Sequence, residues 1–163
     1  MKSSDREAVP AALMFGGDLG DSERIFDRAA ERLRESGFRI LRRSPIFRSA
    51  PVDCVPGTPD FSDQALVGLW QGSAYELLAL CQHLEHEAGR PAEHSSREAR
   101  TLDCDIIIFG DVVSNDPELT LPHPRARERR FVLEPLAGIA PDWRFPDTGT
   151  TVREELGRIE DRN

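Results

Sequence analysis

The stretch Thr101-Leu-Asp-Cys-Asp-Ile-Ile-Ile-Phe109 has the strongest strand pattern in the chain. Side chains alternate between the two faces of a strand, so Asp103 and Asp105 share one face, with alpha carbons about 6.6 Å apart. The opposite face is apolar and comprises Leu102, Cys104, Ile106 and Ile108. Two carboxylates at this separation can bind one cation or a pair of cations, which makes them candidate metal ligands.

Two interpretations of this carboxylate pair remain open from its spacing. Asp103 and Asp105 could form the solvated face of an edge strand, or they could bind a metal ion. Ile107 and Phe109 are predicted on the same face as the carboxylates, and their side chains would cover that face in part. Mg²⁺ commonly takes one or two carboxylates together with substrate phosphates, so it fits the pair better than Ca²⁺, which needs a larger cage of oxygen ligands.

Basic residues flank this strand on both sides. They are Arg90, Arg97 and Arg100 before it, and His123, Arg125, Arg127, Arg129 and Arg130 after it. Guanidinium groups bind phosphate in a bidentate manner, so a cluster of them around a magnesium site predicts a polyphosphate ligand. For any single arginine, the alternative is a surface ion pair with one of the nearby glutamates, which are Glu93, Glu98, Glu118 and Glu128.

Strand and helix patterns alternate in the chain before this strand. They predict a strand over 11–15, a helix from 21 or 22 to 37, a strand near a sheet edge over 38–47, a strand over 61–70, and a helix from 73 to 89. The stretches 48–60 and 90–100 are predicted loops. The resulting order, strand, helix, strand, strand, helix, strand, predicts a ferredoxin-like α+β domain, a βαββαβ sandwich.

Further elements are predicted after residue 109. Gly110-Asp111 suits a turn into Val112-Val113. A helical stretch follows Pro124, and Pro135 is expected to divide it into two pieces. A last short helix is predicted near Thr151. These additional strands and helices would complete a single domain over residues 1–163.

The composition excludes several classes of protein. With 163 residues, 21 basic and 29 acidic side chains, the formal charge is −8, and 31% of the residues are charged. This composition excludes a collagenous protein, a membrane-spanning protein and a protein that coats nucleic acids. We therefore expect neither a membrane nor a nucleic acid as a partner.

The cysteines and the N-terminus bear on the compartment of the protein. Cys54, Cys81 and Cys104 are odd in number and widely spaced, so we expect small buried side chains rather than disulfides or a zinc site. The first residues lack the apolar core of a secretory signal, which predicts a cytoplasmic location. We expect a monomer and leave a dimer open.

Several motifs of this chain occur together in one known family of enzymes. They are Arg100-Thr-Leu-Asp-Cys-Asp-Ile-Ile-Ile-Phe-Gly110, Leu119-Thr-Leu-Pro-His-Pro-Arg125 and Arg129-Arg-Phe-Val-Leu-Glu-Pro-Leu136, preceded by Phe15-Gly-Gly-Asp-Leu19, Ala50-Pro-Val52 and Pro59-Asp-Phe61. In order and spacing they resemble the 6-hydroxymethyl-7,8-dihydropterin pyrophosphokinase family, and the resemblance covers about residues 9–156.

The resemblance implies a ferredoxin-like enzyme that transfers the terminal diphosphate of ATP to a pterin hydroxymethyl group in folate biosynthesis and releases AMP. It implies that Asp103 and Asp105 bind two Mg²⁺ ions, and that Arg90 and Arg100 neutralise charge as the β-phosphorus is attacked. The implied ATP site comprises Gln82, Glu85, Arg90, Arg100, Ile106, Thr120, His123 and Arg129. The implied pterin site comprises Val52, Phe61, Asp63, Asp103 and Phe131, with the two phenylalanines on either side of the flat ring.

The chain departs from the family pattern at positions that bear on activity. Asp63 stands where the family usually has asparagine, and an ionised carboxylate cannot donate to a ring carbonyl. Gly17, Ala92, Arg97 and Glu118 replace a serine, an arginine, a tryptophan and another arginine. Two alternatives therefore stay open: the same chemistry on a modified pterin of another one-carbon cofactor pathway, or a nucleotide-binding homologue with little catalysis.

Overall fold

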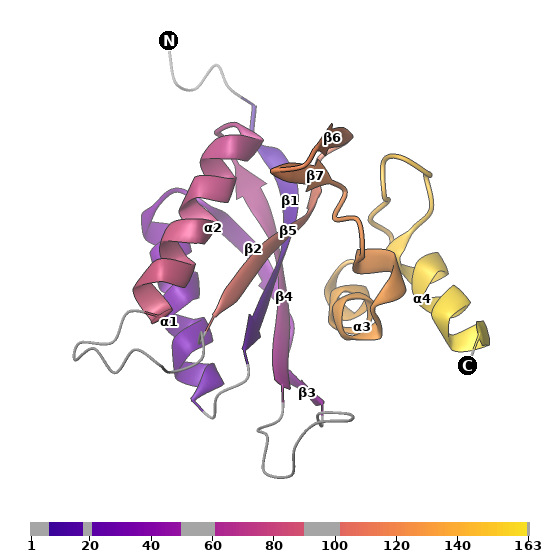
Figure 1. Ribbon diagram of the computed structural model, residues 1–163, viewed down its shortest axis with the longest axis horizontal. Helices are drawn as coiled ribbons and strands as arrows, with labels where there is room; N and C mark the ends of the chain where they lie inside the picture. Colours follow the sequence, from indigo (N-terminus) through magenta and orange to yellow (C-terminus); the bar gives the residue numbers. More distant parts are fainter. Residues whose placement is uncertain (1–6, 18–20, 50–60, 90–101, 163) are drawn as a thin grey trace.

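An antiparallel sheet forms the centre of the computed structural model, of which we describe residues 7–17, 21–49, 61–89 and 102–162 (Figure 1). The strands are β1 (Val9–Gly17), β2 (Arg39–Arg43), β3 (Phe47–Ser49), β4 (Phe61–Trp70) and β5 (Asp103–Phe109). The order across the sheet is β2-β4-β1-β5, and β3 pairs with the first residues of β4. Every pairing is antiparallel.

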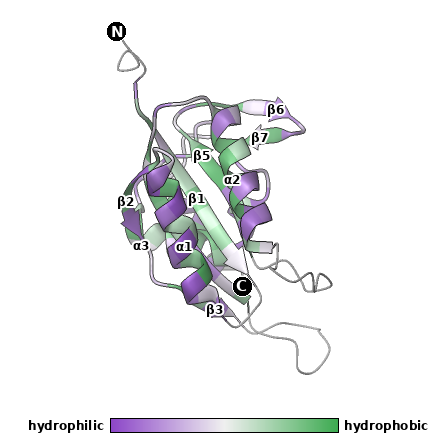
Figure 2. Cartoon of the chain, turned by 90° about the vertical axis from the view of Figure 1, so that its left-hand side faces the viewer, coloured by the Kyte–Doolittle hydropathy of each residue, from purple (hydrophilic) through white to green (hydrophobic). Residues whose placement is uncertain are grey.

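Two helices cover one face of this sheet. They are α1 (Ser22–Glu35) and α2 (Ala74–Gly89), which lie across the strands in Figure 2. Their apolar faces meet those of the strands in a core that includes Phe15, Phe26, Leu33, Leu66, Leu77, Leu84, Cys104 and Ile106. The predicted capping box starts α2, because the Ser73 hydroxyl accepts from the Glu76 N–H at 3.0 Å and the Glu76 carboxylate accepts from the Ser73 N–H at 2.7 Å.

The opposite face carries the C-terminal elements. These are a short 3₁₀ turn, η2 (Ala126–Glu128), and the helices α3 (Arg130–Ile139) and α4 (Val152–Arg162). They form a second core with the sheet that includes Ala12, Ala65, Val67, Ile107, Ile108, Val132, Leu133, Leu136 and Val152. A hairpin of β6 (Ser114–Asp116) and β7 (Leu119–Leu121) links β5 to this layer.

The predicted ferredoxin-like α+β fold is confirmed by this element order and strand arrangement. The additional C-terminal strands and helices are present as well. Cys81 and Cys104 are buried free cysteines, as expected, whereas Cys54 lies outside the described residues. Among the described residues, no helix is both long and apolar enough to cross a membrane.

Three local predictions were wrong in detail. The strand predicted over 38–47 is interrupted after Arg43, because Pro45 has no amide for the ladder, and β3 begins only at Phe47. Pro135 does not divide its helix: it is a buried residue inside α3, where its missing N–H leaves only the Phe131 carbonyl of the first turn without a helical partner.

The third difference is a β-bulge in the strand that carries the carboxylates. Ala12 pairs with Ile108 and Leu13 pairs with Ile106, so Ile107 is an extra residue in β5. The extra residue reverses the alternation after it. Ile108 therefore packs with Ile107 on the α3 side, and Phe109 packs on the side of α1 and α2, the opposite of what strict alternation predicted.

Candidate active site

A row of small and acidic residues crosses three strands on the α3 side of the sheet. Gly16 of β1 lies opposite Asp63 of β4 and also opposite Asp103 of β5. The neighbouring row places Met14 between Ala65 and Asp105. Because the two rows are two residues apart along each strand, their side chains face the same way. The register of the sheet therefore brings three carboxyl groups to one surface.

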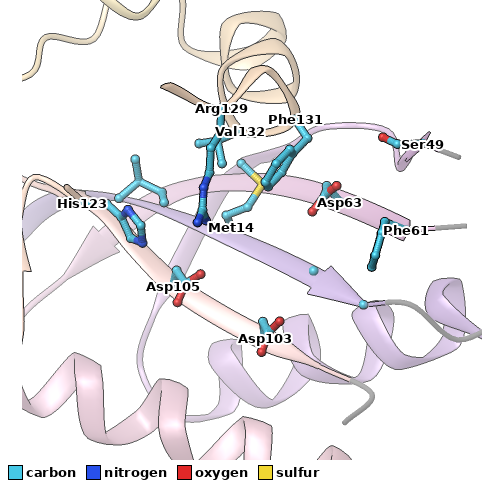
Figure 3. A pocket seen from close by; sticks show the side chains of 13 residues that line it. Met14, Ser49, Phe61, Asp63, Asp103, Asp105, His123, Arg129, Phe131 and Val132 are labelled. Atoms are coloured by element: carbon cyan, nitrogen blue, oxygen red, sulfur yellow. The ribbon is translucent and has the colours of Figure 1, made fainter. Parts of the chain in front are cut away.

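This surface is the floor of a pocket with a volume of about 660 Å³ (Figure 3). Its wall on the other side comes from the start of α3 and from the segment that leads to it. The pocket is lined by Met14, Gly16, Gly17, Ser49, Phe61, Asp63, Asp103, Asp105, Ile107, His123, Arg129, Phe131 and Val132. It thus combines three carboxyl groups from two strands, two basic side chains and two aromatic rings.

Gly16 keeps the middle of the floor open. A β-carbon at this position would lie 3.2 Å from Oδ1 of Asp63 and 4.0 Å from the Asp103 β-carbon. The first distance is shorter than an ordinary van der Waals contact, so a larger residue would push against the Asp63 carboxyl group. The glycine therefore leaves space between Asp63 and Asp103 into which a ligand can reach.

Asp63 is the buried carboxyl group of this floor, with only 7% of its surface exposed. Burial, and secondly the negative charge of Asp103, raise the pKa of Asp63 to about 7. Its carboxyl group has no hydrogen-bond donor among the residues that the structure describes. An aspartate in this setting is suited to a ligand that brings its own N–H groups.

Asp103 and Asp105 are exposed to the pocket from β5, as the alternation predicted. The N–H of Cys104, between them, donates to Oε2 of Glu85 in α2 at 2.8 Å. This bond connects the helix to the outer edge of β5 at the residue whose neighbours both point into the pocket. Within the described part of the chain, no group of three or more histidine, cysteine or acidic side chains is placed to hold a metal ion.

The chemistry of this donor set fits Mg²⁺. Asp103 and Asp105 provide carboxylate oxygens, the ligands that this ion prefers, and they leave most of its coordination sphere to substrate phosphates and water. Such a site differs from a closed structural site, in which protein ligands fill the sphere.

His123 reaches the pocket because the bulge in β5 holds its backbone. The His123 N–H donates to the carbonyl of Ile107, the extra residue, at 2.9 Å. Burial lowers the pKa of His123, the charge of Asp105 opposes this shift, and the charges of Arg129 and Arg125 add to it. The imidazole lies on the same side of the sheet as Asp105 (Figure 3).

Two exposed aromatic rings line the other end of the pocket. Phe61 and Phe131 are 41% and 43% exposed, which is unusual for large apolar side chains in this protein. The guanidinium of Arg129 lies 5.5 Å from the centroid of the Phe131 ring. A flat apolar ligand would cover surface that is otherwise in contact with water.

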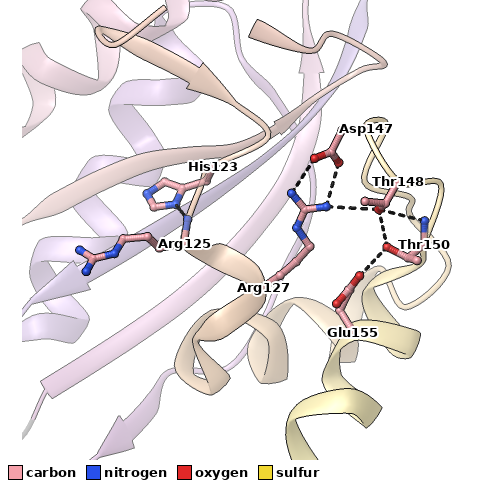
Figure 4. Close-up of polar contacts among 7 residues, drawn as sticks. All are labelled: His123, Arg125, Arg127, Asp147, Thr148, Thr150 and Glu155. Atoms are coloured by element: carbon pink, nitrogen blue, oxygen red, sulfur yellow. Dashed lines mark hydrogen bonds and ion pairs between the residues drawn. The ribbon is translucent and has the colours of Figure 1, made fainter. Parts of the chain in front are cut away.

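The described arginines of the predicted phosphate-binding cluster fall into three groups. Arg129 lines the pocket. Arg127 instead makes a bidentate ion pair with Asp147, in which both N–O distances are 2.8 Å (Figure 4). Arg130 pairs with Glu134 and Glu160, at 3.5 and 3.3 Å. Arg125 is exposed and does not line the pocket. Arg127 and Arg130 are thus paired at the surface, although their partners are not the glutamates expected from the sequence.

Several residues implied at the ATP site lie outside this pocket. The side chain of Ile106 is buried in the core under α1 and α2, and the Thr120 hydroxyl donates to the Asp116 carbonyl at 3.0 Å. Gln82 is exposed on α2, and Glu85 binds the Cys104 amide. Val52, Arg90, Arg97 and Arg100 lie outside the described residues.

Other pocket residues were not assigned to the site from the sequence. Met14 and Gly16 share a face of β1 with buried Ala12, and the alternation of that strand is the signal that would have located them. Ser49 and Val132 have no such signal, because β3 and α3 bring them to the pocket from distant parts of the chain.

Comparisons with known proteins identify relatives of this chain. A sequence model of the family described as 7,8-dihydro-6-hydroxymethylpterin-pyrophosphokinase (HPPK) matches residues 12–141. A 2-amino-4-hydroxy-6-hydroxymethyldihydropteridine pyrophosphokinase of Methylorubrum extorquens is 34% identical over 154 residues, which cover 92% of this chain and 93% of that protein. The folic acid synthesis protein fol1 of Schizosaccharomyces pombe is 32% identical over 150 residues, but this chain spans only 20% of its length.

A solved structure supports the fold independently. A crystal structure of the Plasmodium falciparum HPPK-DHPS protein superimposes with a TM-score of 0.76 over 98% of this chain and 46% of that chain. At 12% sequence identity this likeness concerns the fold alone.

The resemblance predicted from the motifs is confirmed by these matches. The family model covers most of the chain, and the Methylorubrum relative aligns over nearly its whole length. The chain belongs to the 7,8-dihydro-6-hydroxymethylpterin-pyrophosphokinase family.

Proposed function

We propose that this protein transfers the terminal diphosphate of ATP to the hydroxymethyl group of 6-hydroxymethyl-7,8-dihydropterin, with release of AMP, as a step of folate biosynthesis. The observation that carries this proposal is the pocket itself. It has an aromatic end with a buried carboxyl group and an acidic end with a histidine and an arginine. The first suits a flat heterocycle with N–H donors, and the second suits magnesium and phosphate groups.

The pterin would bind at the aromatic end. Phe61 and Phe131 expose apolar rings to the pocket, and Asp63 offers two acceptor oxygens for the amino and ring N–H groups of the heterocycle. Asp103 is nearest to Asp63 across Gly16, so the acceptor hydroxyl would lie between the rings and the carboxylates. Val52, which lies outside the described residues, would complete this part of the site.

The diphosphate would be transferred at the acidic end. Asp103 and Asp105 would hold two Mg²⁺ ions, which would supply charge neutralisation to the phosphate oxygens. The acceptor oxygen forms a bond to the β-phosphorus while the bond from that phosphorus to the oxygen of AMP breaks. His123 and Arg129 would bind phosphate oxygens, and Arg90 and Arg100 would add positive charge to the same region.

The remaining expectations complete the proposal. The nucleotide would extend from the pocket along the outer edge of β5. There it would contact Gln82, Glu85, Ile106 and Thr120, whose side chains do not line the pocket. We propose that residues 1–163 form one pyrophosphokinase domain, which acts in the cytoplasm as a monomer on ATP and a small pterin alcohol. A dimer remains the alternative to the monomer.

A second candidate is the same transfer to a modified pterin. Asp63 favours it, because an ionised carboxylate only accepts hydrogen bonds, where the family's usual asparagine offers both a donor and an acceptor. A pterin whose edge presents two N–H groups would suit Asp63, and a pterin that must accept a hydrogen bond at this position would suit it less.

The test is to measure AMP formed by the purified protein with ATP, Mg²⁺ and 6-hydroxymethyl-7,8-dihydropterin. We expect AMP and the pterin diphosphate in equal amounts, and none without the acceptor. Reactions with ring-methylated dihydropterins would reveal the second candidate as a higher kcat/KM. If ATP binds but no pterin yields AMP, the proposal fails and the chain is a nucleotide-binding homologue.

A further inference from the structure

A hydrogen bond between side chains joins the start of α2 to the tip of the β6–β7 hairpin. The hydroxyl of Tyr75, in the first turn of the helix, donates to Oδ2 of Asp116 at the end of β6. Figure 1 and Figure 2 both place the hairpin beside this end of α2. The two residues are 41 positions apart in the chain, so the bond connects separate parts of the fold.

The bond has a defined donor and a defined acceptor. The hydrogen bond to Asp116 raises the pKa of Tyr75 above its ordinary value, and the same bond is the main reason that the pKa of Asp116 is lowered. The phenol is therefore protonated and the carboxylate ionised near neutral pH. A hydrogen bond to an ionised acceptor is stronger than one between neutral groups.

Asp116 also determines the shape of the hairpin. Its second carboxylate oxygen, Oδ1, accepts from the Glu118 N–H at 3.0 Å, across the turn between the two strands. Its N–H donates to the Ser114 hydroxyl at 3.2 Å, and its carbonyl accepts from the Thr120 hydroxyl at 3.0 Å. The position of Asp116 therefore sets the position of the turn and of Thr120 in β7.

Thr120 and α2 lie at the edge of β5 to which we assign the nucleotide. Leu119 and Leu121, on either side of Thr120, are buried in the core under α1 and α2, so by alternation Thr120 points to the other face of β7. Gln82 follows Tyr75 by seven residues, which places both on the same side of α2. The bond from Tyr75 thus links the two elements that would flank the nucleotide.

We propose that Tyr75 is a positioning residue for the nucleotide, because its hydroxyl, through Asp116, fixes the β6–β7 hairpin relative to α2. This role rests on the proposed function for the identity of the ligand. The hydroxyl donates its proton to Asp116, so Tyr75 acts on the nucleotide through the hairpin and has no part in the chemical step.

A Tyr75→Phe variant removes the hydroxyl and keeps the ring. The side chain is 49% exposed, so the unfolding temperature should change little. Affinity for a non-hydrolysable ATP analogue with Mg²⁺, measured by isothermal titration calorimetry, should fall about threefold to tenfold. The KM for ATP should rise by the same factor, with kcat and the KM for the pterin unchanged. An unchanged affinity, or a loss confined to kcat, would overturn the proposal.

Amide hydrogen exchange tests the hairpin without any ligand. In Tyr75→Phe the amides of residues 114–121 should exchange faster than in wild type, and the Glu118 N–H should show the largest change. The amides of β5 should exchange as before. Unchanged exchange in the hairpin would mean that Tyr75 does not hold it, and would overturn the proposal even if the affinity falls.

A double variant tests whether the hydroxyl acts through Asp116. Asp116→Ala removes the acceptor and should weaken binding of the ATP analogue at least as much as Tyr75→Phe does. Addition of Tyr75→Phe to Asp116→Ala should cause no further loss, because the hydroxyl has already lost its partner. A further loss of full size would mean that Tyr75 contacts the nucleotide directly, which would overturn a positioning role.

Ser73→Ala is the control for a general loosening of the helix. The Ser73 hydroxyl accepts from the Glu76 N–H at 3.0 Å and caps α2 within the same turn as Tyr75. Its loss should lower the unfolding temperature and leave the affinity for the ATP analogue unchanged. An equal loss of affinity in Ser73→Ala would mean that any disturbance of this turn weakens binding, and Tyr75 would have no specific role.

These outcomes can be distinguished from a failure of the proposed function. If the ATP analogue binds but no pterin yields AMP, the diphosphate transfer is wrong, and the affinities of the variants still decide the role of Tyr75. If AMP forms and Tyr75→Phe binds the analogue as wild type does, the transfer stands and the role of Tyr75 is wrong.

Discussion

The face of the sheet toward α3 has two halves, which lie four residues apart along β1. The closed half, at Ala12, is buried under apolar side chains, and the open half, at Gly16, faces the pocket. At Ala12, the row across the sheet continues into Val67 and Ile108, and all three side chains are buried in the core under α3 and α4. At Gly16, the row continues into Asp63 and Asp103 at the pocket. The same three strands therefore serve packing at one end and binding at the other.

The difference between these two rows shows that a binding site on a sheet requires little change in the backbone. Strand pairing is continuous from Ala12 to Gly16 on the β4 side, so the two halves share one rigid frame. What changes is the side-chain chemistry, from apolar residues packed under α3 and α4 to carboxyl groups that line the pocket. A site on regular strands keeps its carboxylates at fixed separations, which favours the precise positioning that group transfer needs.

The largest expected effect comes from placing a pocket residue in the closed half. An Ala12→Asp substitution buries a carboxylate among apolar side chains without a partner, which costs about 3–5 kcal/mol of the free energy of unfolding. Most of a domain's stability is then lost. Thermal unfolding followed by circular dichroism would measure it, with Val113→Asp in the exposed segment before β6 as the control. A stable Ala12→Asp protein would mean that water reaches the side chain at position 12 and that the closed half is not a dry core.

Removing a carboxylate from the open half should have the opposite profile. In Asp103→Ala the fold loses no apolar packing, because this side chain is exposed, and the unfolding temperature should change little. Turnover should fall about 10³-fold or more, since the group would hold the metal at the reacting phosphates. Initial rates of AMP formation would show it, with Asp111→Ala outside the pocket as the control. A folded Asp103→Ala enzyme of normal activity would refute the assignment of the site.

These two substitutions also mark what could be predicted from the sequence. The positions of Asp103 and Asp105 followed from alternation, because a spacing of two residues fixes a common face in any regular strand. The bulge at Ile107 could not be foreseen, since a run of isoleucines carries no signal that distinguishes the paired residue from the extra one.

Partners distant in sequence were the other unpredictable part. Arg127 pairs with Asp147, and Arg130 with Glu160, 20 and 30 residues further along the chain. Tertiary packing of the C-terminal elements selects these partners, whereas the charge pattern alone suggested other glutamates. His123 and Arg129 could be assigned to the site only through the family motifs, because nothing in their local pattern separates them from the arginines that make surface ion pairs.

The buried carboxyl group of the open half should make stability depend on pH. Because the pKa of Asp63 is raised to about 7, the folded protein holds a proton between about pH 4 and pH 7 that the unfolded chain releases. Stability from this group is therefore greatest at low pH and falls as the pH rises through 7. Asp63→Asn has no such group, so it should gain about 2–4 kcal/mol relative to wild type between pH 4 and pH 8.

Denaturant titrations of both proteins at the two pH values would measure this difference. Asp111→Asn is the matched control, since it removes one carboxylate from an exposed turn. The same stability difference between Asp63→Asn and wild type at both pH values would mean that Asp63 is ionised in the folded protein throughout. The carboxyl group of Asp63 would then be solvated rather than buried.

Closing the open half with an apolar side chain should affect binding more than folding. In Gly16→Val the β-carbon meets Asp63 Oδ1 at 3.2 Å, and the branched side chain enters the floor of the pocket. We expect kcat/KM for the pterin to fall about 10- to 100-fold, because the ligand and the valine would occupy the same space. Gly157→Ala, where a β-carbon has no neighbour within 4 Å, is the control. Unchanged kinetics would place the ligand elsewhere in the pocket.

The smallest effect should come from Glu85, which supports the open half from the opposite side of the sheet. Its carboxylate accepts from the Cys104 N–H at 2.8 Å, and the residues on either side of Cys104 are the two carboxylates of β5. Loss of one such bond costs about 0.5–1.5 kcal/mol, so Glu85→Ala should raise the Mg²⁺ concentration for half-maximal activity about threefold to tenfold.

Comparison with two further variants separates positioning from charge. Glu85→Gln keeps an acceptor oxygen for the Cys104 amide and should stay close to wild type if the bond orients β5. Glu87→Ala removes a carboxylate from the same helix, where it pairs with Arg32, and should leave the Mg²⁺ dependence unchanged. If Glu85→Gln and Glu85→Ala lose activity equally, the negative charge of Glu85 matters and the strand needs no support from α2. The open half would then depend on the sheet alone.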